Sequence, residues 1–451
     1  MSKPSPKPAA RPTPPRKRPA SAGPTASVET SLKKITPARM AAFEILTLVG
    51  QNKGHSDELL HSARVDALSP EDRNLATTLV MGVLRWQIAL DARIRTLLQR
   101  PEQRLAEPVA IALRLGAFQL LHLDRIPAHA SLSESVELCR AAGEPHATGM
   151  VNAILRKVAA AQKPGARIHE SVAAFAERLA HPRWLVERWA NTYGREAALK
   201  ICEANQQEPT EGAMFSDSSA DPAQELPNMD DGSRLVAELT VAAKPDAQKV
   251  WDCCAAPGGK TLILALRLAK AHILATDVST RRLAHLEARL SRYSYAANVQ
   301  CAVSDASNST DDELFDLILC DVPCSGTGTL ARNPEIRLRL RPEELARQAE
   351  RQRAILSGAL KRLALGGRLV YSTCSLEPEE CEQVVEAVTA KQNLRQIPID
   401  PLMAKLSKSV LSSSIDLSSS LREGTLRTLP GVHPCDGFYA IVLERPKSVE
   451  K

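Results

Sequence analysis

Two of the ten cysteines in this chain, Cys324 and Cys374, lie in short segments that mix glycine, proline and hydroxyl residues. A free cysteine is usually a small buried hydrophobic residue. We expect that role for Cys139, Cys202, Cys253 and Cys320. Turn-like surroundings instead leave a thiol open to a ligand, so Cys324 and Cys374 are the candidate reactive pair. A redox disulfide between them is the less favoured alternative.

A pair of thiols beside a carboxyl group suits methylation of cytosine at C5. The C5 carbon is too weak a nucleophile to accept a methyl group directly. A thiolate that adds to C6 makes C5 enamine-like and divides one difficult step into two easier ones. Asp321, three residues before Cys324, could stabilise the adduct near N3 of the base. A second thiol could then remove the C5 proton, so that the first thiol can leave.

A glycine turn forms a second candidate site. The turn follows a strand expected over 249–253 and consists of Cys254, Ala255, Ala256, Pro257, Gly258, Gly259 and Lys260. Glycines let the backbone approach a ligand, and the N–H groups of the following helix would point at it. The pattern is neither GxGxxG nor a P-loop, so it gives only weak support for a dinucleotide or a nucleoside triphosphate. A purely structural turn is the alternative.

Two acidic residues, Asp277 and Asp305, follow the next two expected strands. A carboxylate at the position of Asp277 could accept hydrogen bonds from both hydroxyls of a ribose, and Asp305 could accept one from an adenine amino group. Each acid alone is a common strand-end residue. The ordered series of glycine turn, Asp277 and Asp305 is typical of a nucleoside-binding methyltransferase sheet.

Alternating strands and helices are expected to hold these residues together. We expect strands over 249–253, 273–277, 299–303, 315–321, 368–373 and 437–444, the last at an edge of the sheet. Helices are expected over 261–269, 280–292, 342–363 and 377–390. This alternation predicts a mostly parallel, doubly wound sheet whose ligands bind beyond the carboxyl ends of the strands.

The part of the chain before this sheet is expected to be helical. Apolar residues recur every three or four positions between residues 36 and 157, which predicts an all-helical bundle. A further amphipathic helix is expected from Pro182 to about Ala204, followed by a polar segment over 206–232. The predicted organisation is a basic, proline-rich disordered tail over 1–34, a helical domain over 35–165, a helical connector with a shortened linker over 166–245, and an α/β domain over 246–451.

Composition adds little about partners. The net charge is +6, but residues 1–24 carry six positive charges and no acidic residue, so net charge alone does not argue for RNA binding. We find no signal peptide, no apolar run of membrane length and no CxxC pair for zinc, and so expect no membrane and no metal. Cysteines in or beside expected strands fit a reduced, cytoplasmic compartment.

Three segments, residues 253–261, 321–328 and 371–380, resemble the RNA 5-methylcytosine methyltransferases of the NOL1/NOP2/Sun type. The resemblance implies that Cys374 is the nucleophile, that Cys324 assists product release and that Lys260 stabilises charge near the reactants. It also implies S-adenosylmethionine as the methyl donor. The cofactor contacts it implies are Cys254, Ala255, Ala256, Pro257, Gly258, Gly259, Lys260, Asp277, Asp305 and Asp321, the last also facing the target base.

The helical domain resembles a NusB-like RNA-binding bundle, in segments 82–85, 113–116, 125–127 and 151–157. The implied fold is an all-α NusB-like bundle followed by an α/β Rossmann-like class I methyltransferase domain that depends on S-adenosylmethionine. This layout occurs in members of the family that methylate cytosine in small-subunit (16S) ribosomal RNA. The implied substrate is therefore that RNA, or an early assembly particle, and no obligate protein partner is indicated. A tRNA cytosine-C5 methyltransferase and a non-catalytic NusB-like RNA-binding protein are the alternatives.

Overall fold

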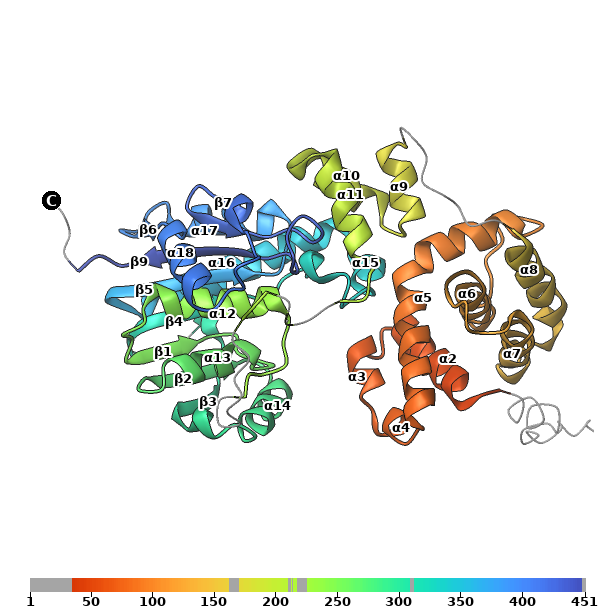
Figure 1. Ribbon diagram of the computed structural model, residues 1–451, viewed down its shortest axis with the longest axis horizontal. Coiled ribbons are helices and arrows are strands. Elements are labelled where there is room, and N and C mark those ends of the chain that lie inside the picture. Colours follow the sequence, from red (N-terminus) through yellow and green to blue (C-terminus); the bar gives the residue numbers. More distant parts are fainter. Residues whose placement is uncertain are drawn as a thin grey trace, which may run out of the picture.

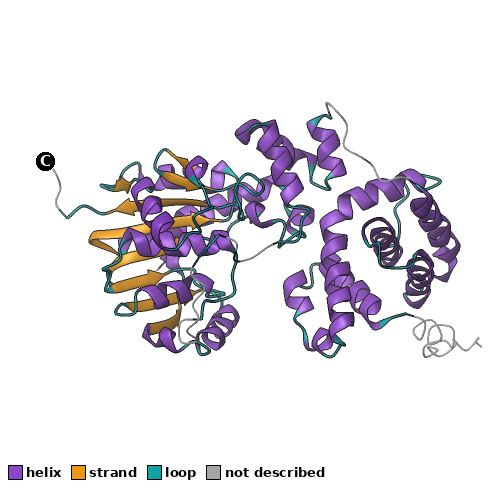
Figure 2. Cartoon of the chain, viewed as in Figure 1, coloured by secondary structure: helices purple, strands orange, loops and turns teal. Residues whose placement is uncertain are grey.

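The computed structural model describes residues 35–161, 170–209, 212, 214–216, 225–308 and 312–447. The tail expected over 1–34 and parts of the expected linker lie outside the described residues. Figure 1 shows a helical bundle beside a sheet flanked by helices, with a short group of helices between the two. The predicted fold class, a helical domain followed by an α/β domain, is confirmed, as the distribution of helices and strands in Figure 2 makes plain.

The N-terminal bundle packs its helices around one apolar core that is separate from the cores of the sheet. Its long helix α5 begins at Pro70, because Ser69 Oγ accepts a hydrogen bond from the N–H of Asp72 at 3.1 Å and the proline suits the first turn. The helices of the bundle are α2 (Pro37–Gly50), α3 (Ser56–Leu60), α4 (Ala63–Asp66), α5 (Pro70–Leu97), α6 (Glu107–His122), α7 (Ala128–Ala141) and α8 (Thr148–Ala160).

The connector contains one more helix boundary than the sequence predicted. The helix expected from Pro182 to Ala204 is two helices, because Gly194 adopts a φ of +87° between them, a conformation that suits glycine. Their apolar sides pack against leucines of the α/β domain, so the connector belongs structurally with the sheet. The connector helices are α9 (Val172–Arg178), α10 (Arg183–Tyr193) and α11 (Arg195–Ala204).

The sheet has the strand order β3-β2-β1-β4-β5-β9-β8-β7, with β6 also paired to β9. Strands β1 to β5 are parallel, and β9 runs antiparallel to β5. The strands are β1 (Lys249–Asp252), β2 (His272–Asp277), β3 (Val299–Val303), β4 (Phe315–Asp321), β5 (Leu363–Thr373), β6 (Arg395–Ile397), β7 (Leu421–Arg422), β8 (Thr425–Arg427) and β9 (Tyr439–Glu444).

The prediction that the last strand lies at an edge is wrong. Strand β9 pairs with β5 on one side and with β6 and β8 on the other. The strands that cover it, β6 and β8, are each only three residues long, too short to produce an alternating apolar pattern in the sequence.

Helices cover both faces of the sheet. The helices α12, α13, α14 and α18 share one apolar core with one face, and α16 and α17 share another core with the opposite face. Helix α12 begins inside the segment expected to be a polar linker. These helices are α12 (Asp231–Ala243), α13 (Gly259–Arg267), α14 (Thr280–Leu290), α16 (Pro342–Lys361), α17 (Glu382–Thr389) and α18 (Asp400–Ser409).

One buried arginine joins the bundle, the connector and the α/β domain. Arg337 lies in the short helix α15 (Ile336–Arg339) and is 1% exposed. Its guanidinium donates to four carbonyl oxygens at 3.2 or 3.3 Å, those of Arg85, Ala180, Asn205 and Leu330. Burial lowers the pKa of Arg337 to about 9. These bonds hold the bundle against the edge of the sheet where the parallel strands end.

Within the described residues, no helix combines the length and the apolar character needed to cross a membrane.

Candidate active site

The two candidate cysteines meet where strands β4 and β5 end. These strands are parallel neighbours, so the segments that follow them emerge side by side. The Sγ atoms of Cys324 and Cys374 lie 3.3 Å apart, and both residues are free, partly buried thiols. The hydrogen bond between the thiols raises the pKa of Cys374 well above its ordinary value, burial raises it further, and the charge of Lys260 opposes the shift.

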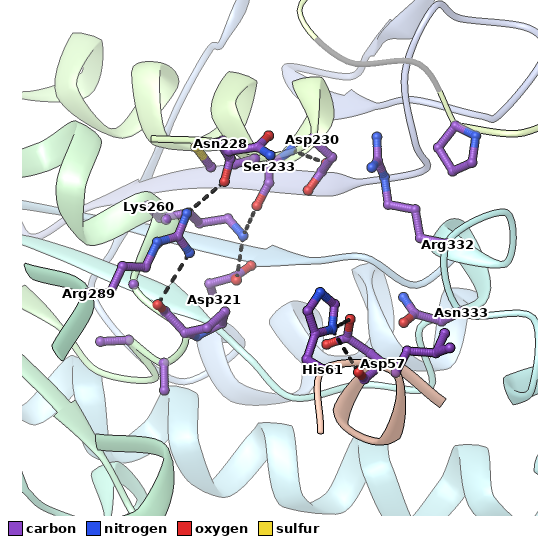
Figure 3. A pocket seen from close by; sticks show the side chains of 18 of the residues that line it. Asp57, His61, Asn228, Asp230, Ser233, Lys260, Arg289, Asp321, Arg332 and Asn333 are labelled. Carbon is purple, nitrogen blue, oxygen red and sulfur yellow. Dashed lines mark hydrogen bonds and ion pairs between the residues drawn. The ribbon is translucent and has the colours of Figure 1, made fainter. Parts of the chain in front are cut away.

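Lys260 and Asp321 form an ion pair beside these thiols. Lys260 Nζ lies 2.8 Å from Asp321 Oδ2 and donates to Ser233 Oγ at 2.6 Å. Ser372 donates to the other oxygen of Asp321 at 2.7 Å. Figure 3 shows the Lys260 ammonium between the Asp321 and Ser233 side chains. The carboxylate is thus fixed in direction at the end of β4.

Sequence analysis did not single out Ser233. It lies in the first turn of α12, where its backbone N–H donates to the side chain of Asp230, the N-cap, at 2.7 Å. A capping aspartate before an apolar run is a usable signal for a helix start. This signal could have predicted the start of α12. The contact between Ser233 and Lys260 could not have been predicted from the sequence.

The glycine turn connects β1 to α13 and forms one wall of a cavity of about 320 Å³. Gly258 adopts a φ of +95° at the N-terminus of α13. Other walls come from the ends of β2, β3 and β4, so the structure brings Asp277, Asp305 and Asp321 to one cavity. Cys254 and Ala256 line it from the turn. The other residues of the turn line only a neighbouring, larger cavity, namely Ala255, Pro257, Gly258, Gly259 and Lys260.

The two strand-end acids of this cavity differ in exposure. Asp277 is 3% exposed, accepts a hydrogen bond from the N–H of Ser279 at 2.9 Å and lies 3.2 Å from Arg282. Asp305 is exposed at the cavity wall. The hydroxyl and N–H of Ser307 donate to Asp305, which lowers the pKa of that carboxyl group.

A larger cavity, of about 750 Å³, lies between the bundle and the α/β domain. Lys260 and Asp321 line it from one side and His61 and Asp57 from the other, as Figure 3 shows. Its remaining polar walls include Arg73, Asn74, Thr77, Asp230, Arg289, Arg332 and Asn333. The helical bundle therefore forms part of the wall of the cavity that contains the Lys260–Asp321 ion pair. No group of residues suited to hold a metal ion occurs in the described part of the chain.

Gly328 is required for a close backbone approach beside Cys374. Its N–H donates to the carbonyl of Cys374 at 2.8 Å. A Cβ atom at this position would lie 2.1 Å from the carbonyl oxygen of Gly437 and 2.7 Å from that of Cys374. Backbone atoms on both sides cannot withdraw without moving the cysteine segment.

We therefore expect Gly328→Ala to lower the free energy of unfolding by about 1–3 kcal/mol, as overpacking does. Urea unfolding would measure the change. Gly149→Ala is the matched control, because nothing lies within 4 Å of a Cβ at that helical position. Equal stability of the two variants would contradict this account of the contact.

Asp252, at the end of β1, is a buried acid with a perturbed pKa. It is 1% exposed and accepts a hydrogen bond from Thr261 at 2.7 Å. Burial raises the pKa of Asp252 from 3.8 to about 7. The folded chain therefore binds this proton more tightly than the unfolded chain does, and protonation of Asp252 contributes to stability. The contribution is fully present below about pH 4, and it is lost as the pH rises through about 7.

We expect the stability of the wild type relative to Asp252→Asn to fall between pH 5 and pH 8. Only the part between pH 5 and the raised pKa of about 7 falls in this interval, so the fall is at most about 3 kcal/mol. Urea unfolding of both proteins at the two pH values measures the difference. A difference that is independent of pH would show that this carboxyl group titrates normally.

The sheet order, the glycine turn and the strand-end acids define the α/β domain as a Rossmann-like methyltransferase domain, joined here to a helical bundle. Comparison with known families agrees. Residues 36–160 match the NusB family, and residues 239–444 match the family described as 16S rRNA methyltransferase RsmB/F. The chain belongs to the ribosomal RNA small subunit methyltransferase B family of enzymes.

Individual relatives support this membership over almost the whole chain. A probable ribosomal RNA small subunit methyltransferase B of Bacillus subtilis (strain 168) is 30% identical over 90% of this chain and 98% of the relative. Its counterpart in Xanthomonas campestris pv. campestris is 30% identical over 90% and 97%. The crystal structure of PH0851 has the same fold, with a TM-score of 0.67 and 21% identity over 91% of this chain and 99% of that one.

Proposed function

We propose that this enzyme transfers a methyl group from S-adenosylmethionine to C5 of a cytosine in small-subunit ribosomal RNA, through a covalent bond between Cys374 and C6. The pair of free thiols 3.3 Å apart, beside the Lys260–Asp321 ion pair, is the observation that carries the proposal. Methylation of an oxygen or an exocyclic nitrogen would not need a thiol pair. A dehydrogenase on the same type of sheet would not need one either.

The smaller cavity fits the proposed cofactor. Its carboxylates suit a ribose and an adenine amino group, with Asp277 and Asp305 at the ends of neighbouring strands, and the glycines of the turn line the adjoining larger cavity. When bound, S-adenosylmethionine supplies an electrophilic methyl group. Residues 254–260, with Asp277, Asp305 and Asp321, are the proposed contacts.

In the proposed reaction, Cys374 first loses its thiol proton, a step that the positive charge of Lys260 favours. The thiolate then adds to C6, electron density moves through the ring to C5, and C5 takes the methyl group with release of S-adenosylhomocysteine. Asp321 faces the base near N3, and Lys260 offsets the negative charge that accumulates close by. Cys324 then accepts the proton from C5, the double bond re-forms, and the C6–sulfur bond breaks to return the Cys374 thiolate. Cys324, in contact with Cys374, is placed to assist this release.

The larger cavity offers a path for the RNA strand to the Lys260–Asp321 ion pair, beside which the two thiols lie. It is lined by residues of both domains, with Lys260 and Asp321 in one wall. Arginine, asparagine and threonine side chains in its walls can bond to phosphates and sugar hydroxyls. We propose that the bundle helps to hold the RNA, free or within an early assembly particle, while the target base enters the α/β domain.

Bisulfite sequencing of total RNA tests substrate and product together. Cells that lack the gene are compared with cells complemented by the wild type or by Cys374→Ala. We expect one cytosine of small-subunit ribosomal RNA to be protected from conversion only with the wild type. Protection that appears in tRNA instead, or with both complementing genes, would contradict the proposal.

A further inference from the structure

A buried carboxylate, Glu380, lies behind the two cysteine segments. It is 0% exposed and occupies the short 3-10 turn Pro378–Glu380, which follows β5 and precedes α17. It lines neither of the two cavities at the site. The proposed chemistry assigns it no role, so its hydrogen bonds require another explanation.

The carboxylate of Glu380 bonds to the residue after each cysteine. Its Oε1 accepts from the backbone N–H of Ser325 at 2.9 Å. Its Oε2 accepts from the hydroxyl of Ser375 at 2.5 Å and from the hydroxyl of Ser325. The two hydroxyls are themselves 3.1 Å apart. One carboxylate therefore connects the Cys324 segment to the Cys374 segment.

Helix α16 completes this arrangement through Gln352, which is 0% exposed. Its side-chain amide donates at 2.9 Å both to Glu380 Oε1 and to the carbonyl of Pro323, the residue before Cys324. Each oxygen of Glu380 thus accepts two hydrogen bonds. A buried carboxylate whose two oxygens are both satisfied favours a single local geometry.

We propose that Glu380 is a positioning residue that sets the relative placement of the Cys324 and Cys374 thiols through Ser325 and Ser375. The proposal rests on the proposed function, because it matters for catalysis only if both thiols act on one base. A displacement of about 1 Å in a reacting group can reduce a rate about 10²-fold. Glu380 acts through the serines and touches neither thiol.

The substitutions Glu380→Ala and Glu380→Gln separate positioning from other effects. Alanine removes every acceptor. Glutamine keeps an acceptor for the two N–H donors, and the serine hydroxyls can rotate to accept from its amide. We expect kcat to fall about 10²-fold with alanine and much less with glutamine, while KM for S-adenosylmethionine stays within about threefold. Glu386→Gln, on the exposed side of α17, is the matched control and should retain the wild-type kcat.

A thiol cross-linker provides a readout that does not depend on methyl transfer. Dibromobimane becomes fluorescent when it bridges two nearby thiols. The difference in fluorescence between the wild type and Cys374→Ala measures the cross-link between Cys324 and Cys374. This cross-link signal should fall in Glu380→Ala and recover in Glu380→Gln. If Glu380→Ala does not fold, Ser375→Ala takes its place, because it removes one donor to Oε2. We expect its kcat to fall about tenfold and its cross-link signal to decrease as well.

Retention of both kcat and the cross-link in Glu380→Ala, or in Ser375→Ala, would overturn the proposal. So would a thermal unfolding shift with no change in either readout, since that result indicates a purely structural role. Full activity of Cys374→Ala would instead overturn the proposed function. The cross-linking result on Glu380 would still stand in that case, so the two failures can be distinguished.

Discussion

Replacement of Cys374 by alanine is expected to abolish methyl transfer. Removal of a covalent nucleophile typically lowers kcat by several orders of magnitude, so we expect a loss of more than about 10⁴-fold. Cys374 packs only at the margin of the apolar core of the sheet, and alanine removes only a partly buried thiol, so the protein should still fold. Incorporation of labelled methyl groups from S-adenosylmethionine into small-subunit ribosomal RNA measures the effect.

Cys301→Ala is the matched control for this experiment. Cys301 is also a free, partly buried cysteine, but it lies within β3 rather than beyond the end of a strand. Its activity should stay close to that of the wild type. Undiminished incorporation by Cys374→Ala would contradict the covalent mechanism.

Replacement of Cys324 by alanine is expected to have a different effect. The attack by Cys374 and the methyl transfer should proceed once, but release should fail, because the thiol 3.3 Å away that assists it is missing. Turnover should therefore cease while a covalent RNA–protein adduct accumulates. A denaturing gel should show a shifted band that ribonuclease treatment removes.

The double variant Cys324→Ala/Cys374→Ala is the control, because it lacks the thiol that would form the adduct. No shifted band should appear with it. A Cys324→Ala protein that turns over normally would contradict the release role. A band that persists in the double variant would show that the bond to RNA involves another residue.

The parallel sheet and the placement of its strand-end residues could be predicted from the sequence. Strands β1 to β5 each produce a short apolar run, and parallel strands bring their carboxyl ends to one edge. For that reason the sequence alone predicts that Cys324, Cys374 and Asp321 lie close together. Asp277 and Asp305 could be expected at one cavity on the same ground.

Contacts between distant segments could not be predicted. Ser233 reaches Lys260 from a helix 27 residues away in sequence, and Glu380 meets Ser325 from 55 residues away. No periodic pattern encodes such pairs, since each depends on how complete helices pack. The internal position of β9 was missed for a related reason, because its short partners leave no alternating pattern. The buried Arg337 resembles any other arginine in the sequence.

Tandem mass spectrometry of the Cys324→Ala adduct tests the central claim most directly. The adduct is digested with nuclease and protease, and the peptide that retains a nucleotide is sequenced. We predict a 5-methylcytidine nucleotide attached through sulfur to Cys374, on a peptide from the end of β5. A nucleotide attached to any other residue, or a base other than cytosine at Cys374, would contradict the account.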